Sequence, residues 1–278
     1  MPELPEVETV RRGLESEVVG RVVERVEVTG RRTVRRHSPD ELVAALLGRR
    51  VVGATRFGKY LVTPLDDGAA LVAHLRMSGQ LLLVAGPAVA LARHTHVVLG
   101  LDDGRELRFV DPRTFGELFV SGHLDATGRP AELATLGIDP LLEGLRASTL
   151  AGLLARRRTS LKAFLLDQRA IAGIGNLYAD EICFRARLRP DHATGDLGPG
   201  EVRRLARAVR DVLVEAVECG GSSLRDERYR DLSGDLGRYQ HHHAVYDRAG
   251  QPCPRCRGTI SRARLAGRSA HFCDRCQA

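Results

Sequence analysis

The sequence predicts an α+β protein in which one helix and an antiparallel β-sandwich precede a helical region and a small cysteine-bearing tail. Three observations carry this prediction. Residues 3–16 place apolar side chains at the spacing of one helix face. From about residue 22 to residue 120, short runs rich in valine and leucine alternate with turn residues. Beyond residue 148 the apolar spacing is again helical, and four cysteines follow near the end of the chain.

Each element has a local reason. Gly20 lies beyond the last turn of the first helix. Two Asp-Asp-Gly turns, at 66–68 and 102–104, stand between apolar runs and predict β-hairpins. Residues 122–148 are rich in glycine and proline and predict a connector with little regular structure. Four helices are then expected, with Gly220 and Gly221 ending the last, at 148–157, 160–168, 177–187 and 199–219.

Composition narrows the class of protein. The chain has 278 residues, of which 43% are hydrophobic and 28% charged, values typical of a soluble globular protein. Charges throughout the first thirty residues argue against a signal peptide or a membrane span, so we expect a cytoplasmic protein with reduced cysteines. Residues 1–145 hold 18 basic and 20 acidic residues, whereas residues 146–278 hold 24 and 15. This imbalance predicts a polyanion bound mainly by the C-terminal half; a membrane surface is the weaker alternative.

Only two of the 42 basic residues are lysines, Lys59 and Lys162. A genome that prefers arginine codons explains the many arginines and the basic charge, but it does not explain why these two lysines remain. Both positions are therefore candidates for a specific role.

The first residues offer a nucleophile. Methionine is usually removed when proline follows it, which would leave Pro2 as a secondary amine beside the carboxyl group of Glu3. Such a terminus titrates near ~7.8, against ~10.4 for a lysine, so part of it is unprotonated at neutral pH. A secondary amine that condenses with a sugar aldehyde carbon forms a cationic iminium. The alternative is a plain helix start, with Pro5 and Glu6 in the first turn.

The tail predicts a metal site. Cys253 and Cys256 are separated by sixteen residues from Cys273 and Cys276. Two such pairs on a hairpin present four thiolates to one structural Zn²⁺, whereas a redox pair would need no second Cys-x-x-Cys. A closed four-thiolate site leaves no position for catalysis, so the zinc would shape a DNA-contacting hairpin.

Three further motifs have both a structural and a functional interpretation. Asn176, after Gly173 and Gly175, can begin a helix whose amides bind a phosphate, or it can simply form a tight turn. Met77 and Phe115 can be core residues, and Arg113 a surface charge. An enzyme that extrudes a base, however, needs apolar wedges and an arginine donor to fill the vacated stack.

The histidines suggest less. His94 and His96 alternate near one strand but lack a third metal ligand, so we expect a phosphate contact or solvent exposure for His94. We interpret His241–His243 as solvated surface. Cys183 and Cys219 fall on expected helices, and we interpret them as buried small residues.

Taken together, these motifs resemble the formamidopyrimidine-DNA glycosylase family of bacterial base-excision repair over essentially the whole chain. The residues that carry the resemblance are Met1–Arg12, Gly58–Leu61, Met77–Gly79, Asp111–Gly116, Gly173–Asp180 and the four-cysteine tail. The resemblance implies four domains: a catalytic β-sandwich (1–125), a linker (126–147), a helix–two-turn–helix domain (148–238) and a zinc finger (239–278).

The resemblance also implies roles for individual residues. Pro2 would attack C1′ of the damaged nucleoside, with Glu3 as the general acid and Glu6 stabilising the helix start. Lys59 would serve β-elimination, and Arg268 δ-elimination and phosphate binding. DNA contacts are implied for His94, Arg113, Arg157, Lys162 and Asn176, and a void-filling trio consists of Met77, Arg113 and Phe115.

The expected activity is therefore that of a bifunctional glycosylase and abasic-site lyase. It would act on double-stranded DNA bearing oxidised purines or abasic sites. We expect a monomer that is associated with the nucleoid in the bacterial cytoplasm. An endonuclease VIII-like enzyme for oxidised pyrimidines is the alternative within the superfamily, although Leu4 and the void-filling trio favour the purine branch. A non-catalytic zinc DNA-binding protein is the alternative from another class, and Pro2, Glu3 and Lys59 together argue against it.

Three features depart from the family pattern. The stretch 224–240, which corresponds to the loop that covers the extruded purine, is atypical, and Arg238 stands where an aromatic residue is common. Asp247 replaces a usual glycine, and Arg257 follows the first cysteine pair.

Overall fold

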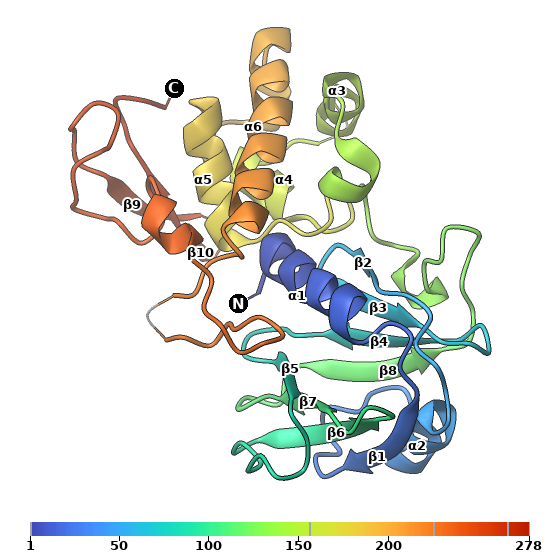
Figure 1. Cartoon of the computed structure of the whole chain (residues 1–278). Coiled ribbons are helices and arrows are strands. Elements are labelled where there is room, and N and C mark those ends of the chain that lie inside the picture. Colours follow the sequence, from blue (N-terminus) through green and yellow to red (C-terminus); the bar gives the residue numbers. More distant parts are fainter. Residues whose placement is uncertain (1, 156, 225, 266, 278) are drawn as a thin grey trace. The chain divides into compact units, whose positions relative to one another are not determined.

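The computed structural model describes residues 2–155, 157–224, 226–265 and 267–277. Packing divides the chain into two compact units. The N-terminal unit consists of residues 1–135 and 219–238, and the C-terminal unit of residues 136–218 and 239–278. Figure 1 colours both along the sequence.

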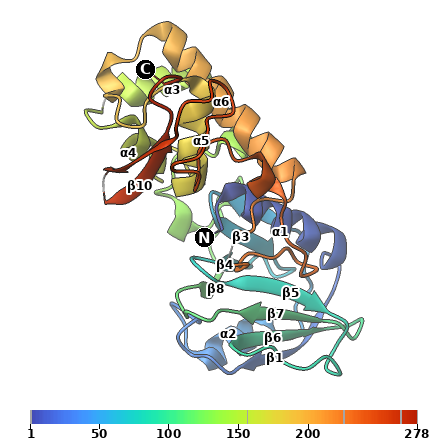
Figure 2. The same ribbon diagram turned by 90° about the vertical axis from the view of Figure 1, so that its left-hand side faces the viewer.

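The N-terminal unit begins with helix α1 (Leu4–Glu17) and contains two antiparallel four-stranded sheets. Figure 2 shows the strands of both. The first sheet has the order β1 (Val23–Val28), β6 (Thr95–Leu101), β7 (Glu106–Val110), β5 (Gln80–Val84). The second has the order β2 (Thr55–Phe57), β3 (Tyr60–Pro64), β4 (Ala70–His74), β8 (Glu117–Ser121). One apolar core joins α1 to side chains from both sheets, so the predicted helix and β-sandwich are confirmed.

Both predicted hairpins are present. The turn at 66–68 joins β3 to β4, with Pro64 opposite Ala70, and the turn at 102–104 joins β6 to β7, with Gly100 opposite Glu106. In each turn the glycine has a positive φ, +87° at Gly68 and +83° at Gly104. A residue with a Cβ adopts this conformation at a cost, which is why the Asp-Asp-Gly signal identifies the turn.

One helix of this unit lies where only strands were expected. Helix α2 spans Pro39–Leu46 and begins with a capping box, in which the Ser38 hydroxyl accepts from the Glu41 amide and Glu41 accepts from the Ser38 amide. Pro39 occupies the first turn, where its missing N–H costs nothing. The sequence Ser-Pro-Asp-Glu is typical of a helix start. The prediction missed it because strand patterns dominate the sequence on both sides.

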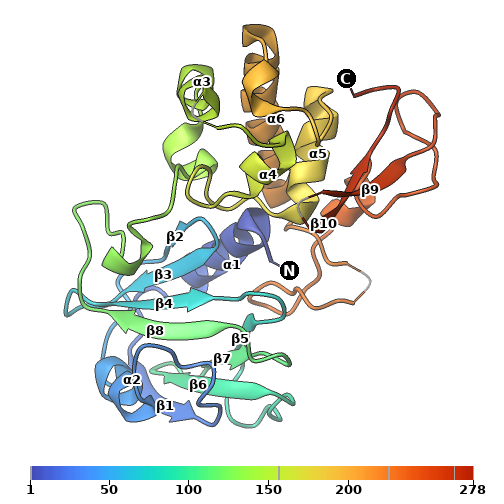
Figure 3. The same ribbon diagram turned by 180° about the vertical axis from the view of Figure 1, so that it is seen from behind.

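The C-terminal unit holds four longer helices and a two-stranded hairpin (Figure 3). They are α3 (Ala147–Ala155), α4 (Leu161–Leu166), α5 (Asn176–Ala186), α6 (Pro199–Glu218), β9 (Ser261–Leu265) and β10 (Arg268–Phe272). Short helical turns occur at Ala131–Leu133 in the N-terminal unit, and here at Pro140–Gly144, Thr194–Asp196 and Tyr239–His242. Helix α5 packs against α4, α6 and β10. The four predicted helices are thus confirmed within two residues at each end, and Gly220 and Gly221 follow the last with φ of +71° and +78°.

Residues 219–238 belong to the N-terminal unit, although the sequence assigned them to the helical domain ending at 238. Tyr229 and Leu232 are buried in the core of the β-sandwich. The Leu83 amide donates to the Leu232 carbonyl at 2.8 Å, and the Gln80 side chain donates to the Arg228 carbonyl at 2.8 Å. Packing, which joins residues far apart in the chain, decides to which unit these residues belong.

No helix of the described ranges is long and apolar enough to span a bilayer.

Candidate active site, DNA-contacting residues and zinc finger

The predicted nucleophile and general acid lie at the start of α1. Pro2 is buried, and Glu3 and Glu6 are 3% and 2% exposed. Glu3 is the N-cap residue, and its backbone N–H donates to Glu6 Oε2 at 2.7 Å. The Glu6 carboxylate thereby fixes the backbone that carries Glu3 and satisfies one free amide of the helix start.

The second oxygen of Glu6 binds a distant segment of the same unit. The Ser222 amide donates to Glu6 Oε1 at 2.7 Å, and the Tyr229 hydroxyl donates to the Gly220 carbonyl at 3.0 Å. A Cβ on Gly221 would lie 2.8 Å from Glu6 Oε1, so only glycine allows this close approach. Burial first, and then the charge of Glu6, raise the pKa of the Tyr229 phenol well above its usual value. Sequence reasoning missed Ser222 and Tyr229, for which the only local signal was the Gly-Gly-Ser-Ser run.

Lys59 occupies the two-residue turn between β2 and β3, and its side chain is 8% exposed. Gly58 has a φ of +58°, as such a turn requires. The buried Arg56 guanidinium donates to the Gly58 carbonyl at 2.9 Å and to Glu8 of α1 at 3.2 Å. Arg56 therefore ties the turn that carries Lys59 to the helix that carries Glu3. Burial opposes ionisation of Glu8, but hydrogen bonds and charges from Arg11 and Arg56 outweigh it and lower the pKa of that carboxyl group.

The void-filling trio stands exposed on two connections of the sandwich. Met77, in the β4–β5 turn, is 37% exposed, and Phe115, in the β7–β8 connection, is 49% exposed. The Arg113 guanidinium carbon lies 4.8 Å from the centre of the Phe115 ring, a cation–π contact. Met77 and Phe115 at this exposure are not core residues, so the core interpretation of both is wrong.

His94 lies just before β6, in a left-handed conformation with φ of +70°, and is half-buried. Its carbonyl accepts the Asp111 amide at 3.0 Å. His96 donates from Nε2 to the Asp111 carbonyl at 2.8 Å, so its ring supports the backbone. The two histidines are joined through Asp111, and no metal-ligating cluster among the described residues includes them.

In the C-terminal unit, Asn176 is the first residue of α5 and Gly175 is the cap. Gln168 shapes the preceding turn: its Oε1 accepts the Gly173 amide at 2.9 Å, and its amide nitrogen donates to the Ile174 carbonyl at 2.8 Å. The buried Oδ1 of Asn176 has no hydrogen-bond partner in the described part of the chain. Buried polar atoms rarely lack partners, so the Oδ1 of Asn176 is free to accept a further hydrogen bond.

Arg157 lines a small hollow formed by the connection before α4 and by α4 itself. The hollow has a volume of about 270 Å³, and its lining includes Arg158, Thr159 and Phe164. Arg157 is 44% exposed and pairs with Asp167 at 2.9 Å. A cation at this exposure is available to a phosphate.

The placement of Lys162 does not fit the expected direct DNA contact. Its side chain is fully buried, and Nζ donates to Asp180 Oδ1 at 2.6 Å and to the Ser269 carbonyl at 2.5 Å. The other carboxylate oxygen of Asp180 accepts the backbone amide of His271 at 2.9 Å. An ammonium that is fully buried and already donates to two oxygen atoms is not accessible to a phosphate. Lys162 instead joins α4 and α5 to β10, the strand that begins with Arg268.

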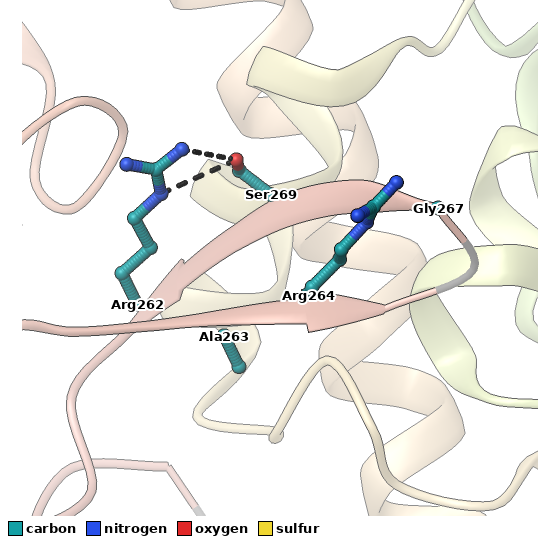
Figure 4. A pocket seen from close by; sticks show the side chains of 5 residues that line it. All are labelled: Arg262, Ala263, Arg264, Gly267 and Ser269. Atoms are coloured by element: carbon teal, nitrogen blue, oxygen red, sulfur yellow. Dashed lines mark hydrogen bonds between the residues drawn. The ribbon is translucent and has the colours of Figure 1, made fainter.

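Arg268 is exposed at the start of β10. A neighbouring surface hollow of about 480 Å³ is lined by Arg262, Ala263, Arg264, Gly267 and Ser269. Figure 4 shows Arg262 hydrogen-bonded to the Ser269 hydroxyl, while Arg264 extends from the same hairpin. The hairpin thus presents three exposed guanidinium groups on a rigid two-stranded support, as a phosphate-contacting element requires.

The four cysteines of the tail meet as predicted. Their sulfur atoms all lie within 4.8 Å of one another, with 3.9 Å between Cys253 and Cys276 and 3.5 Å between Cys256 and Cys273. Four thiolates around one zinc, with Zn–S bonds near 2.3 Å, are about 3.8 Å apart. The donor set therefore fits Zn²⁺. Of the other two cysteines, Cys183 is fully buried, and burial raises the pKa of its thiol; Cys219 is half-buried.

The histidine run is only partly solvated. His241 and His242 are exposed as expected, but His243 is 8% exposed. Burial, followed by the charge of Arg248, lowers the pKa of His243 to about 4. His243 packs edge-on against the rings of Tyr239 and Tyr246, which explains why it points inward.

Two departures from the family pattern have a backbone consequence. Asp247 and Arg257 adopt left-handed conformations, with φ of +56° and +64°. Glycine is the residue that suits such positions, and Asp247 was identified from the sequence as standing in place of a glycine.

Three family descriptions match successive parts of the chain. Residues 1–118 match the formamidopyrimidine-DNA glycosylase N-terminal domain, and residues 136–228 match the formamidopyrimidine-DNA glycosylase H2TH domain. Residues 250–278 match the zinc finger found in FPG and IleRS. With the geometry of its four thiols, the tail is a zinc finger that holds one structural Zn²⁺.

Full-length relatives share this organisation. The formamidopyrimidine-DNA glycosylase of Chloroflexus aurantiacus is 47% identical over 277 residues, covering 100% of this chain and 98% of the relative. Among solved structures, the MutM (Fpg) protein from Thermus thermophilus is 42% identical, with a TM-score of 0.86 over 99% of this chain and 98% of that one. The Fpg of Lactococcus lactis, solved in complex with DNA containing an abasic site, is 31% identical with a TM-score of 0.88, covering 99% of each chain. The chain therefore belongs to the formamidopyrimidine-DNA glycosylase family.

Proposed function

We propose that this chain is a bifunctional DNA glycosylase and abasic-site lyase that excises oxidised purines, such as 8-oxoguanine and formamidopyrimidines, from duplex DNA. The observation that carries the proposal is the buried amino-terminal site, in which Glu6 holds the backbone of Glu3 next to Pro2. A protein that only bound DNA would have no use for two buried carboxyl groups beside its first residue. Solved complexes of the Lactococcus lactis relative contain abasic-site DNA and Fapy-dG DNA, which supports the substrate class.

The first step uses the amine of Pro2 once Met1, which lies outside the described residues, has been removed. The nitrogen attacks C1′ and forms a C–N bond, while the bond from C1′ to the damaged base breaks. Glu3 gives a proton to the ring oxygen, which opens the sugar ring, and the proton lost from the Pro2 nitrogen leaves with the base. The product is an iminium ion that joins the protein to the DNA.

The second step cleaves the strand. The iminium ion withdraws electrons from C1′ and acidifies the C2′ protons, so that loss of one proton expels the 3′-phosphate, and a further elimination expels the 5′-phosphate. We assign Lys59 to proton transfer in β-elimination and Arg268 to phosphate binding and δ-elimination. Lys59 is held by the turn that Arg56 anchors to α1.

DNA binding relies on phosphate contacts from the basic half of the chain. The contacts that we propose come from Arg157, Asn176, Arg264 and Arg268 in the C-terminal unit and from His94 in the N-terminal unit.

The bound zinc holds the finger hairpin in shape and takes no part in the chemistry. Met77, Arg113 and Phe115 fill the space left by the extruded base, which offsets the cost of unstacking. We propose that the protein acts as a monomer in the bacterial cytoplasm, and that residues 1–125 carry the chemistry.

Borohydride reduction of the iminium ion tests the proposal. The protein should form a covalent adduct with duplex DNA that carries 8-oxoguanine opposite cytosine. Pro2→Gly, or a tag that blocks the amino terminus, should abolish most of this adduct, whereas Pro87→Gly, in an exposed loop, should not. An unchanged adduct in the protein with the blocked amino terminus would show that another residue is the nucleophile. A parallel duplex with an oxidised pyrimidine measures lesion preference, and faster excision from it would favour the endonuclease VIII-like alternative.

A further inference from the structure

One buried carboxylate connects the loops that carry the proposed wedge. Asp111 is fully buried. Its Oδ1 accepts the Ser78 hydroxyl at 2.5 Å and the Arg113 amide at 3.2 Å, and its Oδ2 accepts the Gly116 amide at 2.7 Å. Ser78 follows Met77 directly, and Arg113 and Gly116 enclose Phe115. The two loop segments that carry the void-filling trio are therefore both hydrogen-bonded to a single residue.

The backbone of Asp111 adds a third loop. Its amide donates to the His94 carbonyl at 3.0 Å, and its carbonyl accepts from His96 Nε2 at 2.8 Å. His94, the proposed phosphate contact of this unit, is thus fixed to the same centre.

Each of the three loops contains a non-glycine residue in the left-handed conformation. The φ angles are +52° at Arg76, +70° at His94 and +55° at Thr114. Such conformations persist only where the surrounding structure holds them, and they cluster at functional sites. Gly116 is equally constrained, because a Cβ there would lie 2.6 Å from the Phe109 ring and 3.1 Å from Asp111 Oδ2.

We propose that Asp111 is the positioning residue of the wedge: its carboxylate sets Met77, Arg113, Phe115 and His94 in one rigid arrangement before DNA binds. The inference rests on the proposed function, since it explains how the void-filling residues are held. It requires an acceptor at both side-chain oxygens, because Oδ1 accepts from Ser78 and Arg113 and Oδ2 accepts from Gly116. Asparagine has nearly the same shape but would turn an N–H₂ group toward at least one of those donors, which breaks the arrangement with little change in volume.

The test compares Asp111→Asn and Ser78→Ala with a matched control, Asp125→Asn. Asp125 likewise accepts three hydrogen bonds within a turn, from the Thr127 amide and hydroxyl and from the Arg129 amide, but it is exposed. Ser78→Ala removes a single hydrogen bond and therefore keeps the test valid if Asp111→Asn fails to fold. Excision is measured on 8-oxoguanine opposite cytosine and opposite an abasic-site analogue, where no partner base has to be held.

For Asp111→Asn we expect excision opposite cytosine to fall at least tenfold, a change that corresponds to only about 1.4 kcal/mol. Excision opposite the abasic analogue should fall much less, and Ser78→Ala should show a weaker form of the same pattern. An equal fall on both substrates would mean that Asp111 serves folding alone and would overturn the proposal. So would unchanged excision in both variants.

A second readout separates this inference from the proposed function. In a Glu3→Gln background, 2-aminopurine placed beside the lesion reports base unstacking by its fluorescence, without any excision. The Asp111 carboxylate should be needed for the full fluorescence increase, and the Asp125 carboxylate should not. If the otherwise unmodified protein excises nothing, the proposed function fails, yet the fluorescence comparison still decides the role of Asp111. An identical increase with and without Asp111→Asn would overturn the inference.

Discussion

Replacing Lys162 with methionine should destabilise the C-terminal unit strongly, because the change leaves a buried carboxylate without its cation. Lys162 and Asp180 both have side chains that are 0% exposed, and their charged atoms are 2.6 Å apart. Methionine keeps the length and the apolar stem of lysine but cannot donate to Asp180 or to the Ser269 carbonyl. Asp180 would retain the His271 amide and ring as partners.

The size of the effect follows from the burial. Two unit charges 2.6 Å apart attract by about 6 kcal/mol at an effective dielectric constant of about 20, and the desolvation of both groups offsets part of this. Removal of one partner from a buried pair typically costs about 3–5 kcal/mol. Domains are stable by only about 5–15 kcal/mol, so Lys162→Met should consume a large share of the stability of the C-terminal unit.

Urea unfolding measured by circular dichroism, with zinc release followed by a chromogenic chelator, provides the assay. Lys162→Met and Asp180→Leu should each lower the free energy of unfolding by about 3–5 kcal/mol, and the double variant should lose much less than their sum. Arg185→Met is the matched control, because its pair with Glu215 is also close, at 2.7 Å, but is 44% and 34% exposed. We expect at most about 1 kcal/mol there.

The reasoning also predicts early zinc release. Lys162 Nζ bonds to the carbonyl of Ser269, one residue after Arg268, so loss of the ammonium should loosen β10 before the helices unfold. If Lys162→Met costs less than about 1 kcal/mol and releases zinc no earlier than the unmodified protein, the buried network does not hold the finger.

Three further outcomes are expected. His243 has its pKa lowered to about 4 when folded, so the unfolded chain binds its proton first as the pH falls, and stability is lost between about pH 6.5 and pH 4. From pH 7.5 to pH 5 this amounts to about 2 kcal/mol, and in urea melts His243→Phe should remove that part of the pH dependence. Asp247→Gly should raise the free energy of unfolding by about 0.5–1 kcal/mol, because glycine adopts the positive φ without strain; a loss of stability would contradict this. Arg264→Ala should weaken DNA binding uniformly and reduce the salt slope by about 1, whereas Arg210→Ala, on the exposed face of α6, should leave that slope unchanged.

Much of the fold could be predicted because its signals are local. The Asp-Asp-Gly turns specify hairpins by backbone conformation alone, and the helical spacing of apolar residues marks α1 and α6. Helix α2 was not predicted, although the sequence contains its capping box at Ser38. A short helix is difficult to recognise where the residues before and after it have the pattern of strands. The location of residues 219–238 could not be predicted, because it depends on how Tyr229 and Leu232 pack against a core built from other parts of the chain.

The residues of the candidate site also fall into those that the sequence predicts and those that it does not. The zinc cysteines were identifiable because their residue type and spacing are informative by themselves, and the roles of Pro2, Glu3 and the wedge residues stay predictions. The residues that support these groups were not identifiable. Arg56, Asp111 and Ser222 look ordinary in the sequence, and Lys162 looked like a DNA contact until its burial was seen. A charge in a sequence does not reveal whether its partner is a phosphate or a buried aspartate.

By itself, then, the sequence determined the metal and the hairpin turns, since each depends on residues close together in the chain, and it predicted the reacting groups that we propose. Only the tertiary structure decided what holds them in place. Glu6 binds the amide of a residue 216 positions away, Lys162 a carbonyl 107 positions away, and Asp111 a hydroxyl 33 positions away. No local pattern encodes such pairs, because they form only when folding excludes water and leaves each buried polar group to find a partner.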